Sequence, residues 1–410
     1  MGKLKFLFLF FAFIPGTLFS QAISLKQLLK SSLSDPIFKS FDAQQSYLLK
    51  SQNFALPWIN RMQFRYQDNQ LNDFQTRYGL RVEPVNPWQR KHNNQYFQGI
   101  QTLKSIEQKM HLKEILLNRY NMVVEFWMAS ERAHLTTRQK EIREQIGNAL
   151  GQKSGSTGFD TDQFLNAQLD VIAKEADSHE ANFERDVAHG NILAISGATR
   201  FDLLFTELIE VDQINQFINT EINTNRTGLE LLKQRVEVSG LKMKLEKSNI
   251  DLGFLQTMYS TDTRTDRENI LGLALGVTIP LANPNKENVA REKMNTMELQ
   301  GELEQFQLEE KINMASSIAN LKLRLDHYQK LDSLIASVKN KGLNLLTGRS
   351  NNYDPVIELK YQEKLIQFDL LKAKIKKEVL LQYISFLANA DKLHERPMVN
   401  YLSKNFENVE

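Results

Sequence analysis

The chain has 410 residues, no cysteine, and 51 lysines and arginines against 49 aspartates and glutamates. Without cysteine it can form no disulfide bond, thiolate zinc site, iron–sulfur cluster or cysteine-linked lipid anchor. A formal net charge of +2 gives no general basic field for a nucleic acid backbone, so we expect no nucleic acid partner. Only 18 glycines and 9 prolines occur, and so few helix breakers favour long helices.

Residues 1–20 have the pattern of a signal peptide. Lys3 and Lys5 form a charged start, Phe6–Ile14 is an apolar run, and small residues precede a cleavage site near Ser20. The alternative is a membrane anchor, but the run is about half of the roughly 20 residues that a spanning helix needs. We therefore expect cleavage near Ser20 and export, and any membrane insertion would have to use β-strands.

Four segments of about ten residues interrupt the helical pattern and predict strands at about 57–67, 76–86, 250–260 and 269–280. Polar connectors join them into two hairpins. In the first and last segments, apolar or aromatic side chains alternate with polar or small ones, so each strand has one oily face. This length suits a tilted strand that spans a bilayer, although two ordinary hairpins on a soluble domain would also fit. The side chains that we expect to face lipid are Met62, Phe64, Tyr66, Leu273, Leu275, Val277 and Ile279.

Two long stretches carry apolar residues every seven positions, as in a coiled coil. Each stretch ends in a turn-rich break before a second helical pattern, which predicts helical hairpins at about 90–195 and about 285–389. At about 1.5 Å per residue, each first helix would be roughly 90 Å long. The repeating residues are Tyr96, Leu103, Met110, Leu117 and Val124 in the first stretch and Met314, Leu321, Tyr328 and Ile335 in the second.

The two halves of the chain repeat one another. Gly79 precedes Gly272 by 193 residues, and Phe159 precedes Tyr353 by 194, so two separate anchors have nearly the same offset. The expected organisation is a signal peptide (1–20), a first repeat (21–210), a second repeat (211–391) and a C-terminal tail (392–410).

Strands in lipid need a closed barrel, because an open sheet edge leaves backbone N–H and C=O groups with no water to bond. Such barrels need at least about eight strands, and this chain offers about four. Several chains must therefore share one barrel, with the long helices forming a coaxial cylinder beneath it.

The order of these elements resembles the TolC-type outer membrane efflux proteins. A signal peptide, a short SLKQLLKSSLSDP helix, a β-hairpin and a long helical hairpin are followed by the same elements again, with LGLALGVTIPLANPNKENVAREKM. The segment NNYDPVIELKYQEKLIQFDLLKAKIKKEVLLQYISFLANAD also resembles that family's last returning helix. The resemblance covers about residues 21–391.

The resemblance implies a mainly α fold with a membrane β-barrel. Coiled-coil hairpins would form an α-helical barrel, and a homotrimer would share a twelve-stranded barrel in the outer membrane lipid. It further implies a passive exit duct for efflux or secretion, which works with an inner-membrane pump and a periplasmic adaptor protein. The cargo and the identity of these partners are not predicted.

Charged residues in the first hairpin occupy positions where the second hairpin has small residues. Arg81 and Glu83 match Ala274 and Gly276, and they face the pore rather than lipid if the registers match. The set that we expect to face the lumen is Arg61, Arg65, Arg81 and Glu83.

Acidic side chains near the start of the returning helices ring the closed entrance in relatives, where carboxylates favour cations. The matching positions are Asp160, Asp162, Asp354 and Glu358. Aspartate is also a common helix N-cap, so Asp160 and Asp354 could instead satisfy free N–H groups, and Glu358 could lie on a solvated face. Tyr353 and Asp354 stand where the family has a glycine, a hydrophobic run and a Leu-Asp pair, which leaves the entrance geometry open.

Signals for an enzyme are poor. The seven histidines have no metal-ligand spacing, and no segment has a convincing phosphate loop, so we expect neither catalysis nor a cofactor. Two other classes stay open. A secreted or periplasmic coiled-coil scaffold would explain the heptads but not the matched strand pairs, and a pump adaptor would have one hairpin and an inner-membrane anchor.

Overall fold

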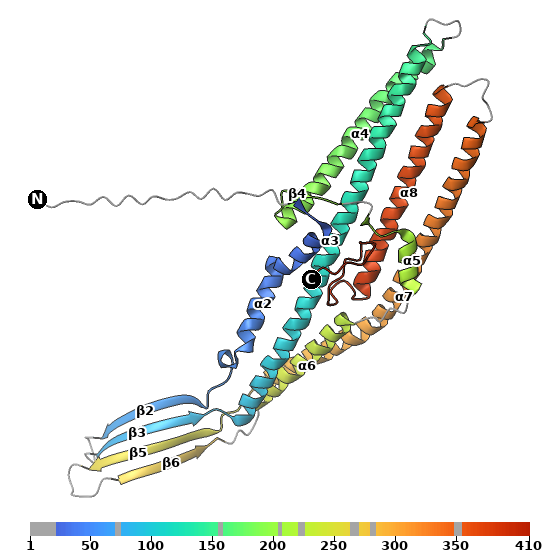
Figure 1. Ribbon diagram of the computed structural model, residues 1–410. Coiled ribbons are helices and arrows are strands. Elements are labelled where there is room, and N and C mark those ends of the chain that lie inside the picture. Colours follow the sequence, from blue (N-terminus) through green and yellow to red (C-terminus); the bar gives the residue numbers. More distant parts are fainter. Residues whose placement is uncertain are drawn as a thin grey trace, which may run out of the picture.

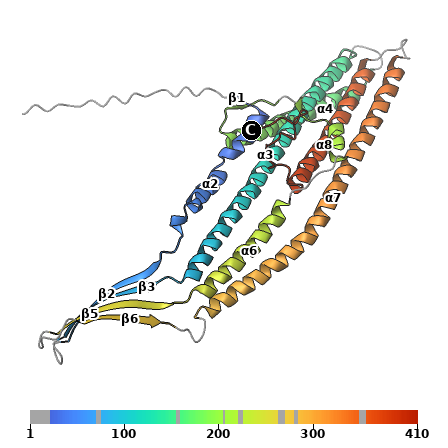
Figure 2. The same ribbon diagram turned by 60° about the horizontal axis from the view of Figure 1, so that its bottom comes forward.

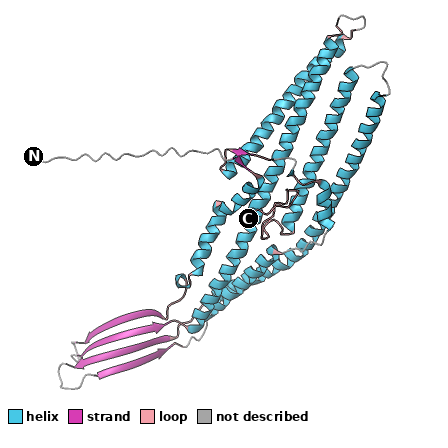
Figure 3. Cartoon of the chain, viewed as in Figure 1, coloured by secondary structure: helices cyan, strands magenta, loops and turns pink. Residues whose placement is uncertain are grey.

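The computed structural model describes residues 22–69, 75–154, 159–203, 207–219, 226–262, 270–278, 284–347 and 355–410 (Figure 1). The expected signal peptide, Ile279 and Asp354 lie outside these residues. The described chain is an elongated layer of helices with a four-stranded sheet at one end (Figure 3). No helix in it is both long and apolar enough to cross a bilayer.

The elements follow one another in two similar series. The helices are α1 (Leu25–Lys30), α2 (Pro36–Leu49), α3 (Pro87–Gly151), α4 (Thr161–Ser196), α5 (Val211–Asn219), α6 (Thr227–Ser248), α7 (Lys286–Thr347) and α8 (Pro355–Asn389), with 3-10 turns at Ser31–Ser34 and Ser51–Asn53. The strands are β1 (Ala22–Ile23), β2 (Ile59–Asn69), β3 (Gln75–Pro84), β4 (Arg200–Phe201), β5 (Gly253–Asp262) and β6 (Ile270–Val277).

The repeat is visible in where these elements begin. β2 begins at Ile59 and β5 at Gly253, a separation of 194 residues, and α4 and α8 begin at Thr161 and Pro355, again 194 apart. The four long strands lie within about three residues of the segments that show period-two patterns. The two helical hairpins are α3–α4 and α7–α8. The apolar patterns gave no separate prediction for α5 or α6.

The helices form one curved layer, and α3 runs along it from the sheet to the hairpin tips (Figure 2). Near the hairpin tips α3 packs between α4 and α8, and α8 packs on α7. Near the sheet α3 packs between α2 and α6, and α6 packs on α7. The order across the layer is therefore α4-α3-α8-α7 at one end and α2-α3-α6-α7 at the other. At 65 and 62 residues, α3 and α7 extend through roughly 90 Å or more.

Local capping explains where the helices start. Asn86 accepts a hydrogen bond from the Trp88 N–H at 3.0 Å, and Pro87 provides the fixed φ that suits the first helical position of α3. Asp35 caps α2 in the same way, with Pro36 as its first residue. These caps fix the points at which long helices leave the sheet and the N-terminal segment.

The main core lies in the middle of the layer, where the C-terminal residues pack against α3, α5 and α8. Sequence patterns set 392–410 apart as a tail, but this segment contributes buried side chains to the core. The Tyr120 hydroxyl of α3 donates to the Val399 carbonyl at 3.0 Å and accepts from the Tyr401 N–H at 3.2 Å. The buried residues of this segment include Leu393, Met398, Tyr401, Leu402 and Val409.

A buried arginine ties the N-terminal segment to the same core. Arg119 of α3 donates to the Leu28 carbonyl and the Ser31 hydroxyl, and its guanidinium lies 3.8 Å from the Asp35 carboxylate. Burial lowers the pKa of Arg119, while Asp35 acts in the opposite direction. Arginine stays charged in proteins, so these partners compensate the cost of burying it.

Replacing Leu402 with alanine tests the role of the C-terminal segment. Leu402 is fully buried, so Leu402→Ala should lower the free energy of unfolding by about 2–5 kcal/mol. Glu407→Ala, five residues away and exposed, is the control and should change it by less than about 0.5 kcal/mol. Thermal unfolding of the detergent-solubilised chain measures both, and equal effects would contradict the packing described.

A polar cluster beside this core predicts sensitivity to acid. Asp391 accepts from the Thr227 N–H at 2.7 Å and pairs with Lys113 at 2.9 Å, and the His394 ring nitrogen lies 3.1 Å from the Thr227 hydroxyl. Burial, the largest cause, lowers the pKa of His394 below its ordinary 6.5, and the nearby Lys113 adds to this while Asp391 opposes it.

Because the pKa of His394 is lowered, the stability of the fold depends on pH. The unfolded chain binds a proton at His394 near pH 6.5 that the folded chain does not bind, so the neutral ring stabilises the fold above that pH. Stability should fall as the pH drops below about 6.5. His394→Gln should reduce the difference in melting temperature between pH 7.5 and pH 5.5, and an unchanged difference would mean that other groups carry the acid sensitivity.

Candidate functional site

The four-stranded sheet has two chemically distinct faces, which its register defines. The strand order is β2-β3-β5-β6, with every neighbour antiparallel. Phe64 lies opposite Leu80, Leu80 opposite Thr257, and Thr257 opposite Leu273, so these side chains share one face. Arg65 is the next residue along β2 and points to the other face.

The first face is apolar and exposed. Leu273 is 74% exposed and Phe64 is 71% exposed, although both are large hydrophobic side chains. A continuous apolar surface of this kind is unusual on a soluble monomer and marks contact with lipid or protein. Six of the seven residues expected to face lipid lie on this face, and the seventh, Ile279, is outside the described residues. The exposed hydrophobic residues of the face are Met62, Phe64, Tyr66, Tyr78, Leu80, Leu255, Tyr259, Leu271, Leu273, Leu275 and Val277.

Aromatic side chains border this apolar band at both ends. Tyr66, Tyr78 and Tyr259 lie opposite one another on three adjacent strands, and the rings of Tyr66 and Tyr78 are 5.4 Å apart. Trp58 precedes β2 and Trp88 is the second residue of α3 at the other end, and both are exposed. The eight residue steps from Trp58 to Tyr66 cover about 27 Å along a strand, or about 20 Å of height at a tilt of about 40°. This is comparable to the apolar band of about 25 Å in membrane barrels, which girdles of aromatic residues flank.

The second face carries the charged residues expected in the lumen. Arg61 lies opposite Glu83, and Arg65 and Arg81 occupy the same face two to four residues away. Arg77 also lies on this face, opposite Gln67. It was not among the residues singled out from the sequence, although its even spacing from Arg81 carried the signal.

Packing on this face explains why the second hairpin has glycine at position 276. The Arg81 guanidinium lies 3.7 Å from the centre of the Phe254 ring and 3.1 Å from the Glu83 carboxylate. A Cβ atom at Gly276 would lie 2.3 Å from that ring. Glycine at 276 therefore leaves room for the ring that supports Arg81.

The tips of the two helical hairpins lie together at the end of the layer away from the sheet (Figure 1). Asp160 caps α4, because its carboxylate accepts from the Gln163 N–H at 3.0 Å. Asp162 is exposed in the first turn of α4. Glu358 is half-buried in the first turn of α8 and accepts from Gln362 at 3.3 Å. The fourth acidic position, Asp354, is outside the described residues.

An ion-pair triad joins the two hairpins near these tips. Arg143 of α3 pairs with Asp170 of α4 at 2.7 Å and with Glu363 of α8 at 2.7 Å. The Glu363 side chain is only 3% exposed, whereas Asp170 is half-exposed. One arginine thus neutralises a buried carboxylate of the other hairpin. Sequence periodicity could not identify this triad, because it combines residues from three helices.

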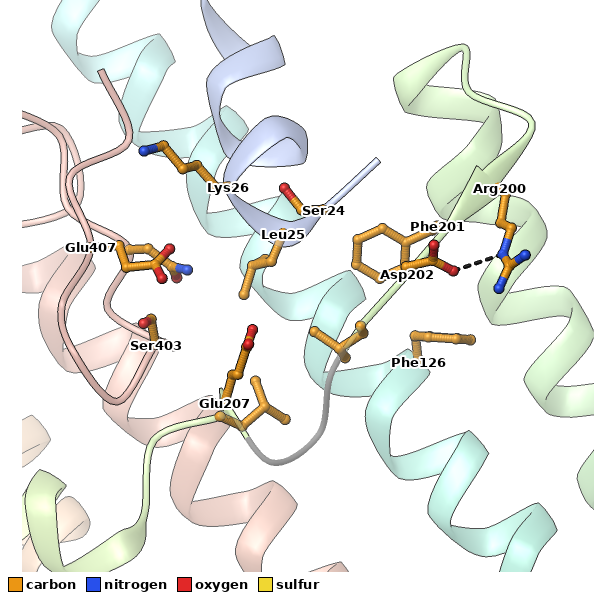
Figure 4. A pocket seen from close by; sticks show the side chains of 13 residues that line it. Ser24, Leu25, Lys26, Phe126, Arg200, Phe201, Asp202, Glu207, Ser403 and Glu407 are labelled. Atoms are coloured by element: carbon orange, nitrogen blue, oxygen red, sulfur yellow. Dashed lines mark hydrogen bonds and ion pairs between the residues drawn. The ribbon is translucent and has the colours of Figure 1, made fainter. Parts of the chain in front are cut away.

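A cavity of about 700 Å³ with a mixed polar and apolar lining lies at the middle of the layer (Figure 4). It is bounded by residues 24–26 near the N-terminus, by residues 200–203 and 207–208, and by Asn400, Ser403 and Glu407 of the C-terminal segment. Arg200 and Asp202 at its wall form an ion pair at 2.7 Å. Among the described residues, no group of three histidines or carboxylates could hold a metal ion.

No family model matches this sequence, and no curated protein matches it. Solved structures do match over nearly the full length. The MtrE outer membrane channel of Neisseria gonorrhoeae, in its open state, has a TM-score of 0.65 at 12% identity and covers 93% of this chain and 90% of its own. The Campylobacter jejuni CmeC outer membrane channel has a TM-score of 0.62 at 10% identity, and the match covers 94% of this chain and 87% of CmeC. The Vibrio cholerae outer membrane protein VceC has a TM-score of 0.64 at 8% identity, and the match covers 90% of this chain and 96% of VceC.

The chain has the TolC-like fold of these outer membrane channels. The sequence prediction of long helical hairpins with four strands in two repeats is confirmed at the level of the fold. In the TolC-like fold of this chain, the amphipathic sheet and the hairpin tips are opposite ends of one layer of helices. The similarity, at 8–12% identity, concerns the fold.

A substitution of Arg143 tests whether the triad holds the hairpins together. Arg143→Met leaves the Glu363 carboxylate buried without its cation, which should cost about 3–5 kcal/mol and lower the melting temperature. Adding Glu363→Met removes the unpaired charge and should restore most of the loss. Arg138→Met, at an exposed position of the same helix, is the control. A double variant no more stable than the single one would contradict the role assigned to Glu363.

Proposed function

We propose that three copies of this chain form an outer membrane duct through which an efflux or secretion system expels its cargo. The observation that carries this proposal is the pair of unpaired edges that the helical layer and the sheet share. The sheet ends at β2 on one side and at β6 on the other, and within the described residues neither strand has a second partner.

The helices have matching edges on the same two sides. α2 and α4 lie on the side of β2, and α7 lies on the side of β6. Both edges expose apolar side chains at helical spacing, which a neighbouring helix would cover. These are Leu165, Leu169, Ile172, Phe183 and Val187 on α4, Ile37 and Tyr47 on α2, and Met294, Met297, Leu308, Ile312, Leu323, Leu334 and Val338 on α7.

Because the two edges differ, contact between copies is head-to-tail and forms a ring when the rotation closes. Each copy supplies four long strands. Three copies give twelve strands, above the minimum of about eight for a membrane barrel, and agree with the trimer that the TolC-type resemblance implies. Closure pairs β2 of one copy with β6 of the next and leaves no edge in lipid.

Charge and hydrophobicity orient this ring. The apolar face, with Met62, Phe64 and Leu273, contacts lipid, and the polar face, with Arg61, Arg65, Arg81 and Glu83, lines the lumen. The helical cylinder continues into the periplasm, where the tips bring Asp160, Asp162 and Glu358 to the entrance. Asp354, which the sequence also predicts at the entrance, is outside the described residues. A periplasmic adaptor and an inner-membrane pump supply cargo and energy, and the duct is a passive conduit without catalysis. The chain reaches this place after signal peptide cleavage near Ser20.

Conductance of the purified full-length protein in a planar bilayer tests the function. We expect stepwise ion conductance, and a protein that only acts as a coiled-coil scaffold would give none. A periplasmic location without membrane-bound particles would also overturn the proposal.

Adjacent residues of β5 test the orientation of the sheet. Leu255→Lys places a charge on the apolar face and should cost about 2–4 kcal/mol near the middle of the bilayer, so that less protein assembles in the outer membrane. Gln256→Lys, one residue further on the other face, should assemble normally. Quantified outer membrane fractions compare the two, and the reverse order would show that the faces are assigned wrongly.

A further inference from the structure

The polar face of the sheet contains four arginines on two adjacent strands. Arg61 and Arg65 lie on β2, and Arg77 and Arg81 lie on β3. In the register, Gln67 is opposite Arg77, and Arg81 is likewise opposite a glutamine. The arginines therefore alternate across the two strands rather than facing one another, which spreads their charge along the strands.

Few acidic residues occupy the described positions of this face. Glu83 pairs with Arg81 at 3.1 Å, and Asp262 holds the position opposite Gln75 at the end of β5. Asp68 belongs to the apolar face, opposite Thr76. The other described positions of β5 and β6 on the arginine face are uncharged. Counted by register position among the described residues, four arginines and two acidic residues on this face leave an excess of two positive charges for each chain.

Two of these arginines, Arg61 and Arg65, are placed to act on solutes. Arg61, Arg65 and Arg77 are exposed, and no carboxylate of the described residues lies within salt-bridge distance of Arg61 or Arg65. A guanidinium group keeps its charge at any physiological pH and binds carboxylate or phosphate through two parallel hydrogen bonds. This surface is thus a fixed positive wall.

We propose that these arginines make the barrel portion of the duct favourable to anions, and that the cargo class is anionic solutes that carry carboxylate or phosphate groups. The inference rests on the proposed function, because only a closed ring turns the arginine face into a lumen. Three copies bring twelve arginines and a net excess of six positive charges to one aqueous passage.

Dimensions decide whether this charge reaches the cargo. Twelve strands about 4.8 Å apart and tilted by about 40° form a barrel of roughly 12 Å backbone radius. Arginine side chains extend several ångströms inward from that wall, and the Debye length is about 8 Å at physiological ionic strength. A solute on the axis is therefore within the field of the arginines, and low-dielectric walls strengthen it.

The hairpin tips carry negative charge, opposite to that of the arginine face, so a measurement on the whole duct would mix the two. Asp160, Asp162 and Glu358 lie at the far end of the duct, where carboxylates favour cations. The reversal potential of the whole duct would combine both ends. A measurement of the local potential at the sheet avoids this mixture.

The chain has no cysteine, so a single introduced thiol can report that potential. Gln67→Cys places it on the arginine face, opposite Arg77 and two residues from Arg65. The full-length protein, reconstituted in vesicles, is treated with an anionic and a cationic methanethiosulfonate reagent of similar size. The rate at which each reagent modifies the protein is divided by the rate at which the same reagent modifies a small thiol in solution. This corrects for the different intrinsic reactivities of the two reagents.

We expect the anionic reagent to react about fivefold faster after this correction. Adding Arg65→Gln and Arg77→Gln should bring the ratio close to one. The matched control, Arg185→Gln with Arg200→Gln, removes two arginines outside the four-stranded sheet and should leave the ratio unchanged. If the double sheet variant fails to assemble, 1 M salt applied to the single Gln67→Cys protein should collapse the ratio, since the Debye length falls to about 3 Å.

The outcomes separate this inference from the function on which it rests. Equal rates, or a faster cationic reagent, at a reactive position 67 would overturn the anion preference and leave the duct intact. Thr257→Cys provides the comparison on the apolar face, where lipid should protect the thiol. Reaction at 257 with none at 67 would show that the arginine face is not the lumen, and would overturn the proposed function together with this inference.

Discussion

The pairing of backbone groups at the two ends of the sheet is the constraint on which the rest of the molecule depends. β2 and β6 each present a row of N–H and C=O groups that lipid cannot satisfy, while the face between them is apolar and exposed. The chain by itself is therefore incomplete in a membrane. The helices share this property, since α4 and α7 carry apolar stripes on the same two sides. In the proposed ring of identical copies, the edges of the sheet and of the helices would gain partners together.

Within one chain, stability is concentrated in the middle of the helical layer. The large core there brings together α3, α5, α8 and the C-terminal segment, with Tyr120 and Tyr383 fully buried. Near the tips, the described part of the hairpins is held by a small apolar cluster, which includes Leu135 and Ile366. There the Arg143 triad adds an ionic connection between the hairpins. A firm middle with weakly joined tips is consistent with an entrance that opens by movement of the hairpins.

The sequence predicted the elements whose patterns are local. Period-two alternation around Phe64 and Leu273 identified the strands, and the heptads of α3 and α7 identified the hairpins, because both patterns are set by one face of one element. The offset of about 194 residues identified the repeat. The candidate residues of the sheet fall on two opposite faces, and their roles toward lipid and lumen stay predictions, as do those of the acidic residues at the tips.

Features that depend on contacts between distant segments were not predictable in this way. The residues after Asp391 lack a regular period, so nothing in their pattern indicated that Leu402 is part of the core. The Arg143 triad joins positions up to 220 residues apart. The tyrosine row needs the cross-strand register of three strands, which neither hairpin sequence specifies.

The mass of the detergent-solubilised particle tests the central claim most directly. Full-length protein expressed with its signal, extracted from outer membranes and measured by light scattering with correction for bound detergent, should contain three chains. A particle of one chain would mean that the edges of the sheet and helices are covered in another way. A soluble periplasmic monomer or dimer would contradict the shared barrel outright.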